Sequence, residues 1–161
     1  MIFLNDLVLG CVIFICAIIG ALLNGILWRP SKQFAQFHPV RNFNPTTPPR
    51  NFLSAFSNAL SSATSAIVNV CGIVLFFYIA AHLMHLPSFL TGLLEMTTGV
   101  AATTNPLLIQ FFVTFGGLSV AMQQQIFMQT FQIKFYKYLL YKFTHAILSC
   151  GLLSLYLLFL N

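Results

Sequence analysis

The sequence predicts an all-α membrane protein with about four transmembrane helices and a short re-entrant or broken-helix segment around residues 88–105. Hydrophobic residues make up 58% of the chain and charged residues only 6%, whereas a soluble domain carries about 25% charged residues. A soluble fold of this length leaves too much of its surface wet to hide so much apolar area. The apolar residues also gather in runs long enough to cross a bilayer, so lipid is the expected solvent.

The first transmembrane helix is expected within residues 1–28, from Leu7 to Trp28. At 1.5 Å per residue this run reaches about 33 Å, enough to cross a hydrocarbon core of about 30 Å. No basic residue precedes it, and it is longer than the apolar region of a signal peptide, so a retained membrane helix is predicted. Trp28 and Arg29 follow where an interfacial anchor and a cytoplasmic stop are expected.

A proline-rich, basic linker is predicted for residues 29–50, because its five prolines are incompatible with a helix or a β-ladder. Its four basic residues form one cluster, and Lys134, Lys137 and Lys142 form a second. Both clusters flank apolar spans. They therefore fit the excess of basic residues in cytoplasmic loops better than a nucleic-acid surface, and no nucleic-acid partner is expected.

Residues 51–161 are predicted to form one membrane domain. Residues 51–86 indicate one long helix or two stacked helices, ended by Pro87, with serine and threonine along one side that allow close helix packing in lipid. Pro106 occupies a favourable first-turn position and opens the next helix. The last span is expected from about 143 to 160, behind an interfacial belt of tyrosine and lysine.

The segment 88–105 decides the topology, because it is too short and too polar to cross a bilayer. A full crossing would place the two basic clusters on opposite sides of the membrane, whereas a hairpin that enters and leaves by one face places both on the same side. The cytoplasmic preference of basic residues favours the hairpin, in a multi-pass protein of the cell membrane with both termini outside. Irregular backbone at membrane depth needs protein or a watery cavity around it, so a cavity for a solute is expected.

Glu95 is the only acidic residue well inside a predicted membrane segment. An ionised carboxylate in hydrocarbon is costly, so it should face a cavity, a cation or a hydrogen-bonding partner. One interpretation makes Glu95, with Thr97 beside it, a ligand for a substrate or coupling ion at a broken helix. The other makes it a structural residue that is protonated or capped by bonds to Thr97, Thr98 or Ser119.

A second break is predicted at Gly116 and Gly117, beside Ser119. An interrupted helix exposes free N–H and C=O groups that can bind ions, although close helix packing alone also explains two glycines. Gln123 lies four residues after Ser119, on the same helix face, where it can support a polar solute. Gly99 is predicted as a further backbone break. The predicted substrate- or ion-binding residues are thus Glu95, Thr97, Ser119 and Gln123.

No pattern in the sequence indicates an enzyme, a cofactor or a metal site. There is no nucleophile–base pattern, phosphate loop or zinc signature. His82 and His85 are three residues apart without a nearby carboxylate, so they are assigned to the outer membrane boundary. The cysteines lie in apolar stretches without a Cys-x-x-Cys pair, which predicts small buried residues rather than disulfides; they are Cys11, Cys16, Cys71 and Cys150.

Two segments resemble paired motifs of a known family. Residues 92–99 read Gly-Leu-Leu-Glu-Met-Thr-Thr-Gly, and residues 115–123 read Phe-Gly-Gly-Leu-Ser-Val-Ala-Met-Gln. Together they resemble the YlbJ-type sporulation integral membrane proteins of the nucleoside-recognition, or Gate, group. Residues 133–140 are similar to the basic and aromatic stretch that follows in that family, and residues 58–78 to the helix that precedes the motifs. Family members are longer, and this chain resembles only their C-terminal half.

The resemblance implies that the chain helps to move a small polar solute across a membrane. In the family this solute is linked to dipicolinic acid loading of the developing spore, and a more distant similarity to concentrative nucleoside carriers suggests a nucleoside-like molecule. Those carriers use a Gly-Phe-x-Asn-x-Ser run, whereas Gly117-Leu118-Ser119 here lacks the Asn. A site between repeats needs both halves, so the implied partner is a separate N-terminal-half subunit or a second copy of this chain. The alternatives are a non-transporting membrane assembly protein and a degenerate half of a split transporter.

Overall fold

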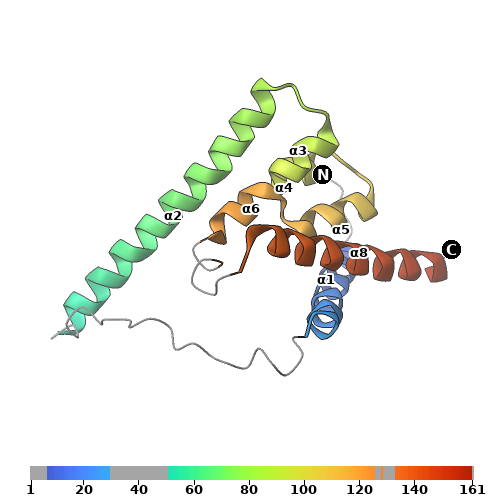
Figure 1. Cartoon of the computed structure of the whole chain (residues 1–161), viewed down its shortest axis with the longest axis horizontal. Coiled ribbons are helices and arrows are strands. Elements are labelled where there is room, and N and C mark those ends of the chain that lie inside the picture. The colour runs from blue at the N-terminus through green and yellow to red at the C-terminus, as the bar shows by residue number, and fades with distance from the viewer. Residues whose placement is uncertain (1–6, 30–50, 126–127, 129–132, 161) are drawn as a thin grey trace.

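The structure, a computed structural model, describes residues 7–29, 51–125, 128 and 133–160, so the predicted linker lies almost wholly outside the described residues. The described part of the chain is α-helical without strands, which confirms the predicted fold class (Figure 1). Four segments are long and apolar enough to cross a membrane, judged by length and composition: Leu7–Leu27, Phe52–Leu83, Pro106–Gln123 and Phe135–Phe159.

The helices follow the predicted order, with short helices where the sequence predicts broken ones. They are α1 (Leu7–Leu27), α2 (Phe52–Leu83), α3 (Ser88–Leu94), α4 (Met96–Ala101), α5 (Pro106–Phe115), α6 (Gly117–Gln123) and α8 (Phe135–Leu160). Residues 52–83 form one continuous helix rather than two stacked ones. The last helix begins at Phe135, so it includes the belt of tyrosine and lysine that was predicted to precede it, because these residues are compatible with a helix that continues into the interface.

The apolar core lies where α1, α5 and α8 meet. Its buried side chains are Ile13 and Cys16 from α1, Ile109 from α5 and Leu153 from α8. Gly20 of α1 lies directly against Ser149 of α8, so closely that a Cβ on Gly20 would overlap the serine hydroxyl. Small residues at such a crossing let two helices approach closely in lipid, where packing rather than the hydrophobic effect drives association.

A short polar network joins α1 to α8 at one end of this crossing. Asn24 Nδ2 donates to the Tyr141 carbonyl at 3.0 Å, and the Thr144 hydroxyl donates to Asn24 Oδ1 at 2.7 Å. The Trp28 indole N–H donates to Thr144 Oγ1 at 3.0 Å, and its ring lies 4.8 Å from that of Tyr141. Hydrogen bonds of this kind hold membrane helices in register, and they fix α1 against the first half of α8.

The short helices α3 and α4 pack against each other through two glycines. A Cβ on Gly99 of α4 would overlap the Cα of Gly92 in α3, and a Cβ on Gly92 would lie 2.5 Å from the Phe112 ring. Gly99 was predicted as a backbone break, and this is wrong: it lies inside α4, and the break is at Glu95, which has extended φ and ψ of −138° and 113°. The close approach of α3, α4 and α5 explains the need for glycine at position 99.

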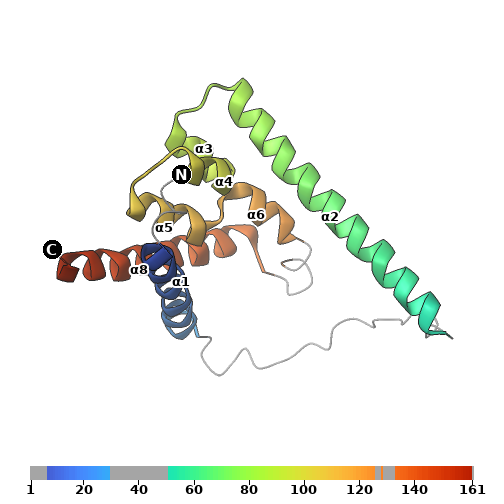
Figure 2. The same cartoon turned by 180° about the vertical axis from the view of Figure 1, so that it is seen from behind.

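Helix α2 extends away from the other helices over most of its length (Figures 1 and 2). Its 32 residues reach about 48 Å, well beyond a hydrocarbon core of about 30 Å. Most of its side chains are exposed, including Cys71. Cys11 of α1 is also exposed, so the prediction that every cysteine is buried is wrong for these two. On a lipid-facing helix a small thiol can point outward without loss, because the surroundings are apolar.

The contact between Gly92 and Gly99 leads to a prediction about stability. Gly99→Ala should lower the free energy of unfolding by about 1–3 kcal/mol, because the added methyl group must push α3 away from α4. Gly72→Ala in α2 is the matched control, since nothing lies within 4 Å of a Cβ at that position. Thermal unfolding in detergent, followed by circular dichroism, should show a lower midpoint for the first variant only. Equal midpoints would contradict the packing.

Candidate functional site

The first feature of the candidate site is the cap that Glu95 forms on α4. Its side chain is 2% exposed. Oε1 accepts from the Thr97 N–H at 3.1 Å, and Oε2 accepts from the Thr98 N–H at 2.8 Å. The hydroxyls of Thr97 and Thr98 also donate to Oε2, at 2.6 and 2.8 Å. The carboxylate therefore receives four hydrogen bonds from one turn of helix.

This geometry matches the structural interpretation of Glu95 as a capped residue. A carboxylate at a helix N-terminus satisfies free N–H groups and lies at the positive end of the helix dipole. Bonds to a charged acceptor are stronger than those between neutral groups, which offsets part of the penalty of burying the charge. Ser119, the third partner considered for Glu95, makes no bond to it: its hydroxyl has no partner among the described residues.

The second break separates α5 from α6. Gly116 and Gly117 have φ values of 82° and 70°, in the left-handed region that glycine adopts without steric penalty. The Gly116 N–H donates to the Phe112 carbonyl at 2.8 Å and closes α5. Two successive left-handed residues turn the chain sharply, so the structure places the interruption at the pair of glycines that the sequence indicates.

The two breaks meet each other. A Cβ on Gly117 would lie 3.2 Å from the carbonyl oxygens of both Leu93 and Leu94, so the C-terminal end of α3 faces the N-terminal end of α6. These ends carry opposite partial charges. At the C-terminal end of α5, Lys142 Nζ donates to the Thr114 carbonyl at 3.4 Å. The central helix ends are thus balanced by a carboxylate, by an ammonium group and by each other.

Two buried polar side chains flank the second break without a partner among the described residues. They are Gln110 of α5, through both its amide atoms, and Ser119 of α6, through its hydroxyl. Both are 0% exposed. Nearly all buried polar groups in proteins are hydrogen-bonded, so groups of this kind need an explanation. An amide before the glycine pair and a hydroxyl after it can therefore bond another group in the interior.

The other predicted site residues lie at the edges of this region. Thr97 is exposed in the first turn of α4, and its hydroxyl is directed at Glu95. Gln123 is half-buried and is the last residue of α6. The structure therefore brings the segments of Glu95 and Ser119 together, and places Thr97 and Gln123 outside their contact.

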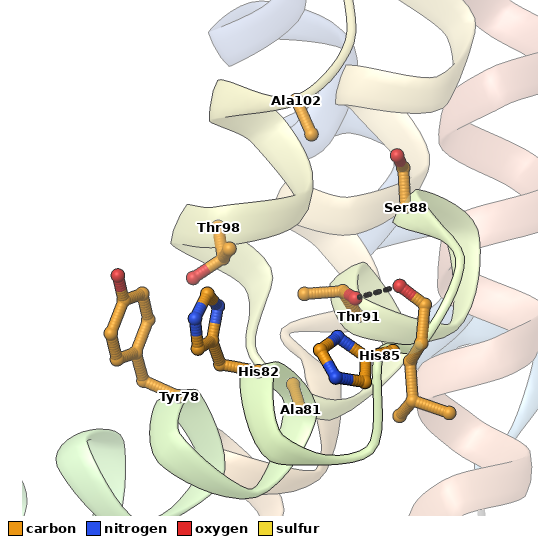
Figure 3. A pocket seen from close by; sticks show the side chains of 9 residues that line it. Tyr78, Ala81, His82, His85, Ser88, Thr91, Thr98 and Ala102 are labelled. Carbon is orange, nitrogen blue, oxygen red and sulfur yellow. Dashed lines mark hydrogen bonds between the residues drawn. The ribbon is translucent and has the colours of Figure 1, made fainter.

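The polar cavity borders the predicted hairpin, but none of the four predicted binding residues lines it. A cavity of about 410 Å³ opens between the end of α2 and the α3–α4 hairpin, and its polar lining comes from Tyr78, His82, His85, Ser88, Thr91 and Thr98 (Figure 3). Glu95, Ser119 and Gln123 do not line it. Sequence reasoning assigned the two histidines to the membrane boundary. The three-residue spacing of His82 and His85, one turn after Tyr78, was the available signal, but it does not show that α3 and α4 pack opposite this face.

An unusual helix end shapes this cavity. The Leu86 N–H donates to the Ala81 carbonyl at 3.3 Å and the His85 N–H to the His82 carbonyl at 3.2 Å, which is the Schellman pattern. His85 has a φ of 47° at the position where glycine is usual. A side chain in this conformation is strained, and strained residues cluster at functional sites. The motif ends α2 and turns the His85 ring toward the cavity (Figure 3).

A second cavity, of about 450 Å³, is apolar. Its walls come from Met84, Leu86, Leu90, Leu93, Leu94, Phe115, Leu118 and Leu139. It offers no polar group to orient a solute, and a lipid chain has the same character as its lining.

Comparison with protein-family models, with curated proteins and with solved structures finds no match to this chain.

The cap on α4 leads to a prediction about Glu95. Glu95→Ala should lower the free energy of unfolding by about 2–4 kcal/mol, because the N–H and hydroxyl groups of Thr97 and Thr98 lose the acceptor of four hydrogen bonds. Glu95→Gln keeps one acceptor oxygen and should show an intermediate loss. Unfolding midpoints in detergent measure both. A Glu95→Ala protein as stable as the wild type would show that the cap does not stabilise the hairpin.

Proposed function

We propose that the chain is a membrane half-transporter subunit that moves a small polar solute across the cell membrane. The observation that supports it most is the meeting of two broken helices around a buried carboxylate. Secondary transporters bind solutes and coupling ions at interrupted helices, whose free N–H and C=O ends supply the ligands. Such interruptions are costly in lipid and are tolerated where protein or a cavity surrounds them.

The polar character of the solute is supported by the two side chains beside the second break that have no partner within the described ranges. Ser119 and Gln110 offer a hydroxyl and an amide that both donate and accept hydrogen bonds. The resemblance to the Gate group makes a dipicolinate-like or nucleoside-like molecule the first solute to test, in a sporulation context. Both molecules present the mixture of donors and acceptors that such side chains recognise.

A partner is part of this proposal, because a site between repeats requires two halves. Most of the first half of α2 is exposed, and it carries serine and threonine among its apolar residues. Such a face favours contact with another membrane helix, since small hydroxyl residues allow close packing and bonds between helices. Either a separate N-terminal-half subunit or a second copy of this chain can supply that helix.

The proposed topology places both termini outside and both basic clusters inside, with the α3–α4 hairpin re-entering from the outer face. Arg29→Cys and Lys134→Cys should be protected from a membrane-impermeant maleimide in intact cells and labelled after permeabilisation. Ser88→Cys should be labelled in intact cells. All three are made in a chain whose native cysteines are replaced by serine. Labelling of Arg29→Cys and Lys134→Cys from opposite sides would remove the hairpin, and the transporter proposal with it.

The transport proposal is tested with membrane vesicles from the native host, from which the chain has been deleted and then restored as variants. Uptake or release of radiolabelled dipicolinate and uridine is measured. Ser119→Ala should reduce flux about tenfold if its hydroxyl bonds the solute, a change typical of one lost hydrogen bond. Ser149→Ala is the matched control, because Ser149 is equally buried and also lacks a partner in the described part of the chain, but lies at the α1–α8 crossing. Equal flux for both solutes with and without the chain would contradict transport of these molecules.

One observation favours a second function, that of a membrane assembly protein without transport. The Glu95 carboxylate already receives four hydrogen bonds, so the hairpin is stable without any solute. The exposed face of α2 would then be the surface that binds other membrane proteins. Flux that is the same with and without the chain, together with loss of co-purifying membrane partners on substitution of the α2 serines, would support this alternative.

A further inference from the structure

The cavity at the end of α2 is a separate feature from the two helix breaks. Its volume of about 410 Å³ falls in the range of small-molecule sites, and its walls come from three helices. In the view of Figure 3 the His82 ring is directed toward Thr98 and the His85 ring toward Thr91, and all four side chains line the cavity. What such a cavity binds depends on which of these groups can donate and which can accept.

The hydroxyl protons of both threonines are already used. Thr98 Oγ1 donates to Glu95 Oε2 at 2.8 Å, and an ionised carboxylate can only accept. Thr91 Oγ1 donates to the carbonyls of Leu86 and Pro87, both at 3.3 Å, and these also can only accept. Each hydroxyl has a single proton, so the oxygens of Thr91 and Thr98 offer only lone pairs. The cavity wall therefore has two oriented acceptors.

The charge near the cavity is negative. Lysine, arginine and acidic side chains are absent from its described lining, but the Glu95 carboxylate lies directly behind Thr98. The C-terminal end of α2 and the N-terminal end of α3, which begins at Ser88, both border the cavity. These ends carry about half a charge each with opposite sign, so they offset each other. The N-terminal end of α4 offsets about half of the charge of Glu95, which leaves a net negative charge behind Thr98.

Aromatic rings add to this preference for a cation. Tyr78 and His82 have parallel rings whose centroids are 6.4 Å apart, and both line the cavity. The face of a tyrosine ring attracts an ammonium group within about 6 Å. A neutral imidazole also keeps one nitrogen that accepts a hydrogen bond.

We propose that this cavity binds a small organic ammonium cation that donates hydrogen bonds to Thr91 and Thr98. The acceptors are held in place by their own bonds, and Glu95 supplies the compensating negative charge through Thr98. This inference goes beyond the proposed transport and does not depend on it, because binding is measured without flux.

The test is equilibrium dialysis of the full-length chain in detergent against radiolabelled methylammonium. Saturable binding is expected, with displacement by unlabelled methylammonium. Tetramethylammonium has the same charge without N–H donors and should compete at least tenfold more weakly, and acetate should not compete. Absence of saturable binding, or competition by acetate, would overturn the proposal. Equal competition by tetramethylammonium would overturn the role of the two acceptors.

A matched pair of variants separates binding from folding. Thr98→Val and Thr97→Val each remove one hydroxyl bond to the same oxygen of Glu95, but only Thr98 lines the cavity. Thr98→Val should weaken methylammonium binding about tenfold, while Thr97→Val should leave it unchanged. Thr91→Val, which leaves the Glu95 cap intact, should weaken binding by a similar factor. Equal binding by Thr98→Val and Thr97→Val would show that Thr98 is not a ligand.

Discussion

The interrupted helices depend on partners for the polar backbone groups at their central ends. A helix end leaves N–H or C=O groups without partners, and in an apolar solvent each such group is costly. Here Glu95 accepts hydrogen bonds from the first turn of α4, and Lys142 donates to a carbonyl of the last turn of α5. The C-terminal end of α3 faces the N-terminal end of α6. Each of these helix ends is thus paired with a side chain of opposite charge or with the opposite end of another helix dipole. Four short helices are therefore possible where an uninterrupted span would otherwise be expected.

Close packing keeps these ends together. Gly92, Gly99 and the Phe112 ring form a stack in which no further atom fits, so α3, α4 and α5 hold one arrangement. Gly117 does the same at the second break, where two carbonyl oxygens occupy the space that a side chain would need. The absence of a side chain at these positions is thus a geometric requirement of the hairpin, and it determines where the ends of the half-helices point.

The long spans and the breaks were predictable, but the residues that line the cavity were not. Apolar length alone marks the four candidate spans, Pro106 marks the start of α5, and two adjacent glycines mark the second break. These are local signals. Gly99 was misread because a glycine needed for a neighbouring helix has the same appearance in sequence as one needed for a bend. The place of His82 and His85 in the cavity could not be predicted, because the cavity requires α2 and the hairpin to meet, which depends on tertiary packing.

The two interpretations of Glu95 need not exclude each other. As a cap it is fully bonded, which leaves it poorly placed to bind a solute directly. Those same bonds hold the hydroxyl of Thr98 with its proton turned inward and its lone pairs free, and they keep a negative charge one bond behind the cavity wall. A buried carboxylate can in this way stabilise a helix end and give a neighbouring cavity a negative electrostatic potential. The buried charge therefore has two structural consequences: a rigid hairpin and a cavity that prefers cations.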